Sequence, residues 1–390
     1  MRGFVAGCLL LVLAAGSGAN AESTEAEKAF QSGQFEAARA AYAKELAASP
    51  KDMKALSRSA DLALFDDRLE DAAGYLRRLG AVDPKNVDVR RGMAEIAARR
   101  GQDEEYRITG LSSVVEIPFV ASEPLPVVVL RVNGKRNANF LIDTGAPGVV
   151  IDEELAKTLG MTVRTSGTGV FAGGVRAGSQ ETRVDGLRVG GVTVEGIHAM
   201  VMPLGHAPAP QGMRIDGIVG TTFFYHFLTT IDYKRQRLVL RPRGDSAAFE
   251  ERARGRGDSA TRMWLVPDHF LFARALVNGK YSALLNIDTG GEGIGLQATK
   301  ATLDGAGIVT DGAHPGTFMT PGGEVKTLPF KATVAVGSRR IADLPGTYFP
   351  SGDQYEIFPF RVGGTLSDQF FRGGAVTFDF NAMLLVVGEN

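Results

Sequence analysis

Two patterns of hydrophobic and polar positions divide this chain. Residues 22–105 are rich in Ala, Glu, Arg and Leu and show helical periodicity, whereas from Leu111 onward β-branched residues alternate with Gly-rich turns. Within the β-type part, residues 243–262 are rich in Arg, Asp, Gly and Ser and show no apolar periodicity, which is typical of an exposed linker. The pattern predicts a helical region followed by two stretches of β structure, at 110–242 and 263–390.

The first 21 residues have the pattern of an export signal. Arg2 precedes an apolar run from Leu9 to Ala15, and Ala19-Asn20-Ala21 has the A-x-A form of a cleavage site. A membrane-spanning helix needs about 20 apolar residues, and this run is shorter. We therefore expect residues 1–21 to be removed, the mature chain to lack a membrane span, and the protein to be exported, to a bacterial periplasm or secreted. Cys8, the only cysteine, would leave with the signal, so no disulfide is expected.

The helical region repeats with a period of 34 residues. Gly33-Gln34-Phe35 recurs as Asp67-Arg68-Leu69, and Pro50 recurs as Pro84. Small residues at fixed points allow paired helices to pack closely, and a proline ends each second helix. The repeat resembles tetratricopeptide repeats, although the signature Trp and Tyr positions are mostly absent. A generic array of helical hairpins is the alternative.

The β-type part is itself duplicated. Val132–Lys135 returns as Val277–Lys280, and Ile142–Gly145 returns as Ile287–Gly290, both at a shift of 145 residues. Further along, the stretch that begins at Phe223 returns at Phe370, now at a shift of 147. Two homologous lobes, 110–242 and 263–390, are the simplest explanation.

In each lobe an apolar strand leads into Asp-Thr-Gly, at Asp143 and at Asp288. A buried strand that ends at a carboxylate, followed by a Gly that permits a tight turn, places the carboxylate at a sheet edge. Two such motifs at equivalent points of a duplication predict a shared site with two carboxyl groups. The alternative is that each Asp caps backbone amides in a strand-end turn.

At these residues the sequence resembles the aspartic peptidases of the pepsin and retropepsin type, over about residues 110–390. Ala146 is the small residue typical of retropepsins after the motif, and Asp216–Gly220 looks like the apolar-apolar-Gly segment of the family. The resemblance implies a mainly β, bilobal aspartic-protease fold that is complete in one chain and acts on a peptide or protein substrate as a monomer. It also implies no cofactor and no metal. The implied catalytic residues are Asp143 and Asp288, and the residues implied to support their loops are Thr144, Gly145, Thr289 and Gly290.

A flap over the substrate is expected in each lobe. The candidate in the first lobe spans residues 171–175 and includes Phe171, Gly173 and Gly174. Its counterpart runs from Met319 to Gly323. Both combine an apolar contact residue with Gly hinges, as a closing hairpin needs. An ordinary Gly-rich hairpin is the alternative for each.

The second lobe departs from the family pattern at three positions. Asn286 places an amide two residues before Asp288, Gly291 has no side chain, and Ser367 replaces the Gly that ends the apolar-apolar-Gly segment. We expect Ser367 either to crowd the Asp288 loop or to hydrogen-bond to it. These changes put the competence of the second lobe in question.

Other chemistries have little support. The formal net charge is −1 and no basic stripe appears, so nucleic acid is not expected as a partner. The histidines are scattered and are expected to be surface or hydrogen-bonded core residues, at positions 198, 206, 226, 269 and 314.

The sequence therefore predicts an exported aspartic endopeptidase behind a helical repeat domain. Three alternatives stay open. The β lobes could form a non-catalytic peptide-binding module with a degenerate second lobe. The helical repeats could be the main functional part, a scaffold that binds a protein partner. Residues 22–105 could also be a prosegment, because protease prosegments lie between signal and enzyme.

Overall fold

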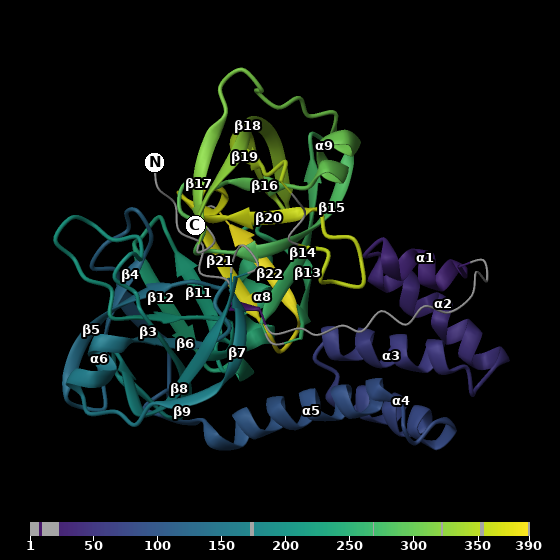
Figure 1. The fold of residues 1–390 in the computed structure, drawn as a ribbon, viewed down its shortest axis with the longest axis horizontal. Helices are drawn as coiled ribbons and strands as arrows, with labels where there is room; N and C mark the ends of the chain where they lie inside the picture. Colours follow the sequence, from purple (N-terminus) through teal and green to yellow (C-terminus); the bar gives the residue numbers. More distant parts are fainter. Residues whose placement is uncertain are drawn as a thin grey trace.

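The computed structural model describes residues 8–9, 23–171, 175–267, 269–320, 323–351 and 355–388. A helical region lies on one side of a larger, mostly β region (Figure 1). This agrees with the predicted fold class at the level of a mainly β protein with N-terminal helices.

Five helices form the helical region as successive antiparallel pairs. Their bounds are α1 (Glu25–Gln31), α2 (Phe35–Ala48), α3 (Met53–Phe65), α4 (Leu69–Val82) and α5 (Val87–Glu105). The turns between α1 and α2 and between α3 and α4 place Gly33 at φ 66° and Asp67 at φ 57°, in the left-handed region. These positions are 34 residues apart, so the period of the sequence is also a period of the backbone. Among the described residues, no helix is both long enough and apolar enough to cross a membrane.

Two sheets make up the β region. One has nine strands in the order β1-β7-β8-β4-β5-β10-β6-β9-β2, and the other has thirteen in the order β17-β18-β19-β16-β20-β15-β14-β13-β22-β21-β11-β12-β3. The strands of the first sheet are β1 (Cys8–Leu9), β2 (Arg107–Thr109), β4 (Val127–Val132), β5 (Arg136–Ile142), β6 (Val149–Asp152), β7 (Arg164–Phe171), β8 (Val175–Val189), β9 (Val192–Met202) and β10 (Gly217–Val219). Those of the second are β3 (Val115–Pro118), β11 (Leu228–Asp232), β12 (Arg237–Arg241), β13 (Ser259–Val266), β14 (Phe270–Val277), β15 (Tyr281–Asp288), β16 (Leu296–Ala298), β17 (Gly316–Thr320), β18 (Gly323–Val336), β19 (Arg339–Tyr348), β20 (Gly364–Ser367), β21 (Ala375–Asp379) and β22 (Leu384–Gly388).

The two halves of the β region share one succession of elements. The run from β4 to β12, with the short helices α6 (Glu153–Thr158) and α7 (Thr221–Phe224), is matched by the run from β14 to β22 with α9 (Lys300–Ala306) and α10 (Asp368–Phe371). The halves meet where β11 pairs with β21, and there Thr230 lies opposite Thr377 with their hydroxyl groups 2.7 Å apart. These two threonines are 147 residues apart, the shift seen in the sequence.

The segment that joins the halves, expected as an exposed linker at 243–262, contains regular secondary structure. It forms a 3-10 turn at Arg243–Asp245 and the helix α8 (Ser246–Gly255), and β13 already begins at Ser259. Phe249 and Ala253 are four residues apart on one face of α8 and are buried in a small core with Leu228 and Val386. Two apolar residues are too few to show a period among so many polar ones, so the sequence pattern missed this helix.

The helical region is fixed to the second half of the β region by an apolar core. Aromatic side chains of the helices, such as Phe30, Phe35 and Phe65, are packed with Trp264 and Phe360 of the β part. Ring centroids of Phe35 and Trp264 lie 5.3 Å apart in an edge-to-face arrangement. Aromatic pairs of this kind contribute about 0.5–1.5 kcal/mol beyond their burial.

The turn after α3 adds polar anchors to both halves. Asp66 is buried and pairs with Arg262 of β13 at 2.8 Å. Its neighbour Asp67 accepts a hydrogen bond from the Tyr225 hydroxyl of the first half at 2.7 Å and pairs with Arg99 of α5 at 3.2 Å. The helical region therefore has a defined orientation relative to both halves.

Candidate active site

Asp143 and Asp288 each stand at the end of a buried strand. Asp143 follows β5, which runs parallel to β10, and Asp288 ends β15, which runs parallel to β20. The residues before each Asp are buried, including Ile142 and Ile287. The strand patterns therefore bring each carboxyl group to an edge of a sheet, as the sequence predicted.

The two Asp-Thr-Gly loops are joined by a reciprocal pair of hydrogen bonds. The Thr144 amide donates to Thr289 Oγ1 at 3.0 Å, and the Thr289 amide donates to Thr144 Oγ1 at 3.1 Å. The Thr144 hydroxyl in turn donates to the Ile287 carbonyl at 2.9 Å. Both threonines are buried. The two threonines therefore join the two loops directly.

The glycines of the motifs permit the close approach of the loops. Each Asp accepts a hydrogen bond on Oδ1 from the glycine two residues later, at 2.7 Å for Gly145 and 2.8 Å for Gly290. A Cβ on Gly145 would lie 2.5 Å from a carboxylate oxygen of Asp288, and one on Gly290 would overlap the Asp143 carboxyl group. Each carboxyl group therefore lies against the glycine of the opposite loop, so any side chain at these glycines would separate the pair.

The electrostatics favour one shared proton. Both carboxyl groups are buried, with residue exposures of 4% for Asp143 and 6% for Asp288. Burial raises the pKa of Asp143 well above its ordinary value, and the charge and hydrogen bonding of Asp288 raise it further. Burial also raises the pKa of Asp288, while the Gly290 amide and a hydrogen bond with Asp143 act against that increase. Two close carboxyl groups do not ionise together easily, so the pair favours a state in which it holds one proton.

Ser367, the last residue of β20, hydrogen-bonds to the second loop and does not crowd it. In the first loop the Ala146 amide donates directly to the Asp143 carbonyl at 3.2 Å. In the second loop the Ser367 hydroxyl stands between the equivalent groups: it accepts from the Gly291 amide at 3.0 Å and donates to the Asp288 carbonyl. The same two backbone groups are satisfied in both loops, once directly and once through a hydroxyl.

Gly291 makes room for this hydroxyl. A Cβ on Gly291 would overlap Ser367 Oγ and lie 3.1 Å from Ser367 Cβ. In the first loop the roles are exchanged, because a Cβ on Gly220 would overlap the Ala146 carbonyl oxygen. The departures at Gly291 and Ser367 are therefore two halves of one arrangement that keeps the Asp288 loop in place.

The flap candidates lie on hairpins. Phe171 ends β7 opposite Val175 at the start of β8, and Met319 lies in β17 opposite Glu324 of β18. Gly173 and Gly174 lie outside the described residues. In addition, Cys8 and Leu9 form β1, which pairs antiparallel with Phe171 and Val170 of β7.

Three polar groups near the pair carried no signal in the sequence motifs. Tyr233 is buried, and the charges of Asp368, Asp143 and Asp288 add to burial in raising its pKa. Asp368 follows Ser367, is fully buried, and pairs with Arg372, which also donates to the Pro124 carbonyl of the other lobe. His269 is the third: it is buried, and burial lowers its pKa to about 3, while hydrogen bonding with the Gly145 backbone of the other lobe acts against that decrease. In the sequence, only an alignment of the two lobes at the shift of the duplication could have indicated these positions.

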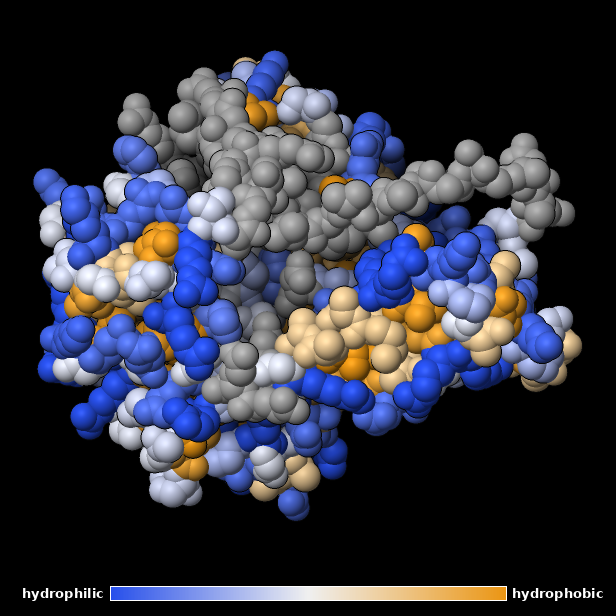
Figure 2. All heavy atoms as spheres, turned by 60° about the horizontal axis from the view of Figure 1, so that its bottom comes forward, coloured by the Kyte–Doolittle hydropathy of each residue, from blue (hydrophilic) through white to orange (hydrophobic). Residues whose placement is uncertain are grey.

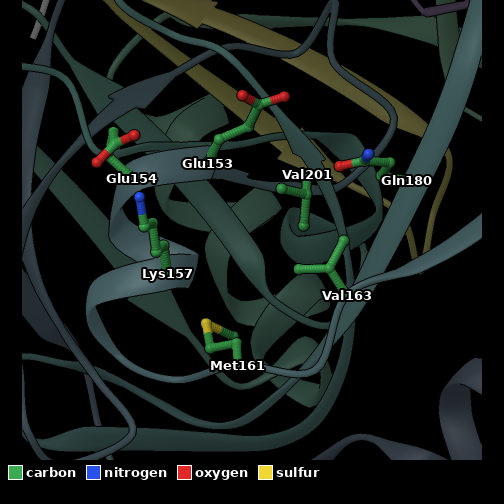
Figure 3. Close-up of a pocket in the computed structure, with 7 residues that line it drawn as sticks. All are labelled: Glu153, Glu154, Lys157, Met161, Val163, Gln180 and Val201. Atoms are coloured by element: carbon green, nitrogen blue, oxygen red, sulfur yellow. The ribbon is translucent and has the colours of Figure 1, made fainter.

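A separate hollow of about 510 Å³ lies on the first lobe, lined by residues of α6, β8 and β9 and of the segment after α6 (Figure 3). Its lining mixes charged and apolar groups, namely Glu153, Glu154, Lys157, Met161, Val163, Gln180 and Val201. Neither Asp143 nor Asp288 lines it. Within the described residues, no group of three or more His, Cys, Asp or Glu side chains is placed to hold a metal ion.

Comparison with known proteins gives a family match for part of the chain. Residues 128–223 match the model of a family described as aspartyl protease. This stretch runs from β4 to α7 and includes the first Asp-Thr-Gly loop. No curated protein matches the chain. The match supports an aspartic protease-like fold for residues 128–223, which confirms that part of the prediction.

Solved structures with low similarity were also found. Basic 7S globulin from soybean is 12% identical at a TM-score of 0.45, and the alignment covers 71% of this chain and 95% of the globulin. Conglutin gamma, a basic 7S globulin from lupine seeds, is 10% identical at a TM-score of 0.42, with the same coverage of 71% and 95%. A retropepsin-like aspartic protease from Rickettsia conorii is 19% identical at a TM-score of 0.24, over 33% of this chain and 93% of that protein.

Proposed function

We propose that this protein is an aspartic endopeptidase whose catalytic pair is Asp143 and Asp288. The observation that supports this most is the reciprocal hydrogen bonding of Thr144 and Thr289, because it holds two buried carboxyl groups together at the junction of the two halves. Two carboxyl groups that share one proton can act as base and acid in the same step.

The reaction follows from the shared proton. The ionised carboxyl group takes a proton from a water molecule, whose oxygen attacks the carbonyl carbon of the peptide bond. The protonated carboxyl group donates a hydrogen bond to the carbonyl oxygen and stabilises the charge that develops there. When the tetrahedral intermediate breaks down, a carboxyl group of the pair gives its proton to the nitrogen of the leaving amine, and the carbon–nitrogen bond breaks.

The rival proposal is a peptide-binding module without activity. It drew support from the departures of the second lobe, and the Ser367 bridge removes much of that support because the Asp288 loop keeps its backbone hydrogen bonds. Asp288 itself is retained. A common origin of the two halves, by duplication, is part of the proposal and is supported by their shared succession of elements.

The helical region is proposed to be a tetratricopeptide-like surface for a protein partner or for the substrate. It packs on the second half through a core that includes Phe35 and Trp264, which suits a permanent domain better than a removable prosegment. Apolar side chains gather in a band over the helices on the face shown in Figure 2. Val87 and Met93 of α5 are among the exposed apolar residues of the chain. We propose further that the chain is exported, to a periplasm or secreted, and that one chain is sufficient for activity.

The test is cleavage of a peptide library by the protein that begins at Glu22, compared with the variants Asp143→Asn and Asp288→Asn. Each variant should lose activity, because an amide cannot share the proton, and each should fold, because the amide has the shape of the carboxyl group. Asp304→Asn is a matched control: this acid is exposed, and its ion pair is with Lys300 on the same helix, so activity should stay unchanged. Substantial turnover by either dyad variant would contradict the assignment. Peptide binding without cleavage by the wild type would favour the binding module.

A further inference from the structure

A hydrogen bond ties the helical region to the first half of the β region. The Tyr225 hydroxyl donates to Asp67 Oδ2 at 2.7 Å, and Asp67 stands in the left-handed turn between α3 and α4. The carboxyl group of Asp67 is held from two sides, because Arg99 of α5 pairs with it at 3.2 Å and Arg243 at 3.7 Å. Burial and the charge of Asp67 raise the pKa of Tyr225, so its hydroxyl stays protonated and able to donate. The bond therefore joins two groups with fixed positions.

Tyr225 stands at the end of the one-turn helix α7. It follows Phe224, and its amide donates to the Thr221 carbonyl at 2.8 Å. The residue is buried, and its ring packs edge-to-face on Phe380 of the second half with centroids 5.5 Å apart. The Arg243 guanidinium covers the ring at 4.4 Å from its centroid. Because the amide bond closes a single helical turn, a displacement of Tyr225 is passed to Thr221.

Thr221, at the start of α7, holds the loop that carries Asp143. Its hydroxyl donates to the Thr144 carbonyl at 2.8 Å, and its amide donates to the Ala146 carbonyl at 3.0 Å. Thr221 is fully buried. The Thr144 amide is in turn the group that donates to Thr289 of the opposite loop. One residue of α7 therefore fixes the Asp143 loop at two points.

The loop of the second half is held in a different way. At the shift of 147 residues, Tyr225 corresponds to Arg372 and Thr221 corresponds to Asp368. Arg372 pairs with Asp368 of α10 and donates to the Pro124 carbonyl of the first half. The hydrogen bond to Asp67 is therefore a feature of the Asp143 side of the carboxyl pair.

We propose that the helical region is part of the catalytic unit, and that Asp67 and Tyr225 are positioning residues for Asp143. The hydrogen bonds run from Asp67 through Tyr225 and Thr221 to the loop that carries Asp143. A displacement of that loop moves Asp143 relative to Asp288, and a misplacement of about 1 Å can slow a reaction about a hundredfold. This inference rests on the proposed peptidase function for its effect on the rate.

The test compares the kinetics of the wild type with those of Tyr225→Phe, which removes the hydroxyl and keeps the ring. The kcat should fall by about tenfold or more and KM should change by less than about twofold, because the substitution alters the position of Asp143 and removes no exposed group. Asp67→Asn keeps an acceptor oxygen and should retain more of kcat. Tyr42→Phe is the matched control, because Tyr42 is also buried and donates to Glu27 at 2.5 Å within the helical region. An unchanged kcat in Tyr225→Phe, or an equal fall in Tyr42→Phe, would overturn the proposal.

A second measurement does not depend on cleavage. Hydrogen exchange of backbone amides, followed by NMR, reports how firmly each loop is held. Tyr225→Phe should raise the exchange rate of the Thr144 amide relative to that of the Gly291 amide, which donates to Ser367 in the other loop, and Tyr42→Phe should leave this ratio unchanged. If the wild type cleaves no peptide but the ratio rises in Tyr225→Phe, the peptidase function fails and the positioning role stands. If peptides are cleaved and the ratio is unchanged, the positioning role fails and the function stands.

Discussion

The substitution Gly291→Ala tests whether Gly291 and Ser367 form one arrangement. The added methyl group would overlap Ser367 Oγ, and this hydroxyl cannot swing away without losing its bonds to the Gly291 amide and the Asp288 carbonyl. Overpacking of a closed core costs about 1–3 kcal/mol. We expect Gly291→Ala to lower the free energy of unfolding by about that amount and to reduce kcat/KM, because the Asp288 loop must shift.

The companion substitution Ser367→Gly removes the bridging hydroxyl. Two buried hydrogen bonds are lost, at about 0.5–1.5 kcal/mol each, so the expected loss is about 1–3 kcal/mol. In the double variant the methyl group has space, and the residue 291 amide can donate directly to the Asp288 carbonyl, as Ala146 does to Asp143. The double variant should therefore be more stable than the sum of the single effects predicts, with a coupling of about 1–3 kcal/mol.

The assay is urea unfolding of the four proteins, with kcat/KM on one peptide measured in parallel. Ala146→Gly combined with Ser367→Gly is the control pair: these residues belong to different loops, and their effects should add to within about 0.5 kcal/mol. Additive effects of Gly291→Ala and Ser367→Gly would show that the two residues act independently, and the proposed compensation would be wrong.

Three further predictions concern the carboxyl pair, the helical anchor and the assembly. The folded-state pKa values of Asp143 and Asp288 are raised above the unfolded value of about 3.9. The free energy of unfolding of the wild type should therefore fall relative to that of Asp143→Asn as pH rises above about 4. Parallel plots of the free energy of unfolding against pH for the two proteins at about pH 4–8 would contradict this. Asp66→Ala removes a buried carboxylate that pairs with half-exposed arginines, and it should lower the free energy of unfolding by about 2–3 kcal/mol. The control Asp71→Ala breaks an exposed ion pair and should lower it by less than about 1 kcal/mol. Equal losses in urea unfolding would show that Asp66 does not anchor the helical region. Specific activity should stay constant on dilution, since both loops lie on one chain, and a steep loss that follows a monomer–dimer equilibrium would refute the monomeric site.

The sequence by itself determined the features that depend on local pattern and internal repetition. Helical periodicity and a 34-residue period predicted the paired helices, and alternation predicted the β region. The motifs at Asp143 and Asp288 were recognisable because the same Asp-Thr-Gly follows an apolar strand at equivalent points of the duplication. Their repetition at a constant shift indicated that they lie together, although no local property of either motif requires it.

Only the tertiary structure decided what depends on contacts between distant segments. Whether Ser367 crowds or completes the Asp288 loop depends on space that Gly291 leaves 76 residues earlier. The packing of α8 depends on partners at Leu228 and Val386, which no local pattern identifies. His269 looked like one scattered histidine among five because its environment is formed by the loop around Gly145 in the other lobe. Periodicity records which side of a segment is apolar, whereas burial, unpaired polar atoms and raised pKa values arise from the atoms that the fold brings next to each group.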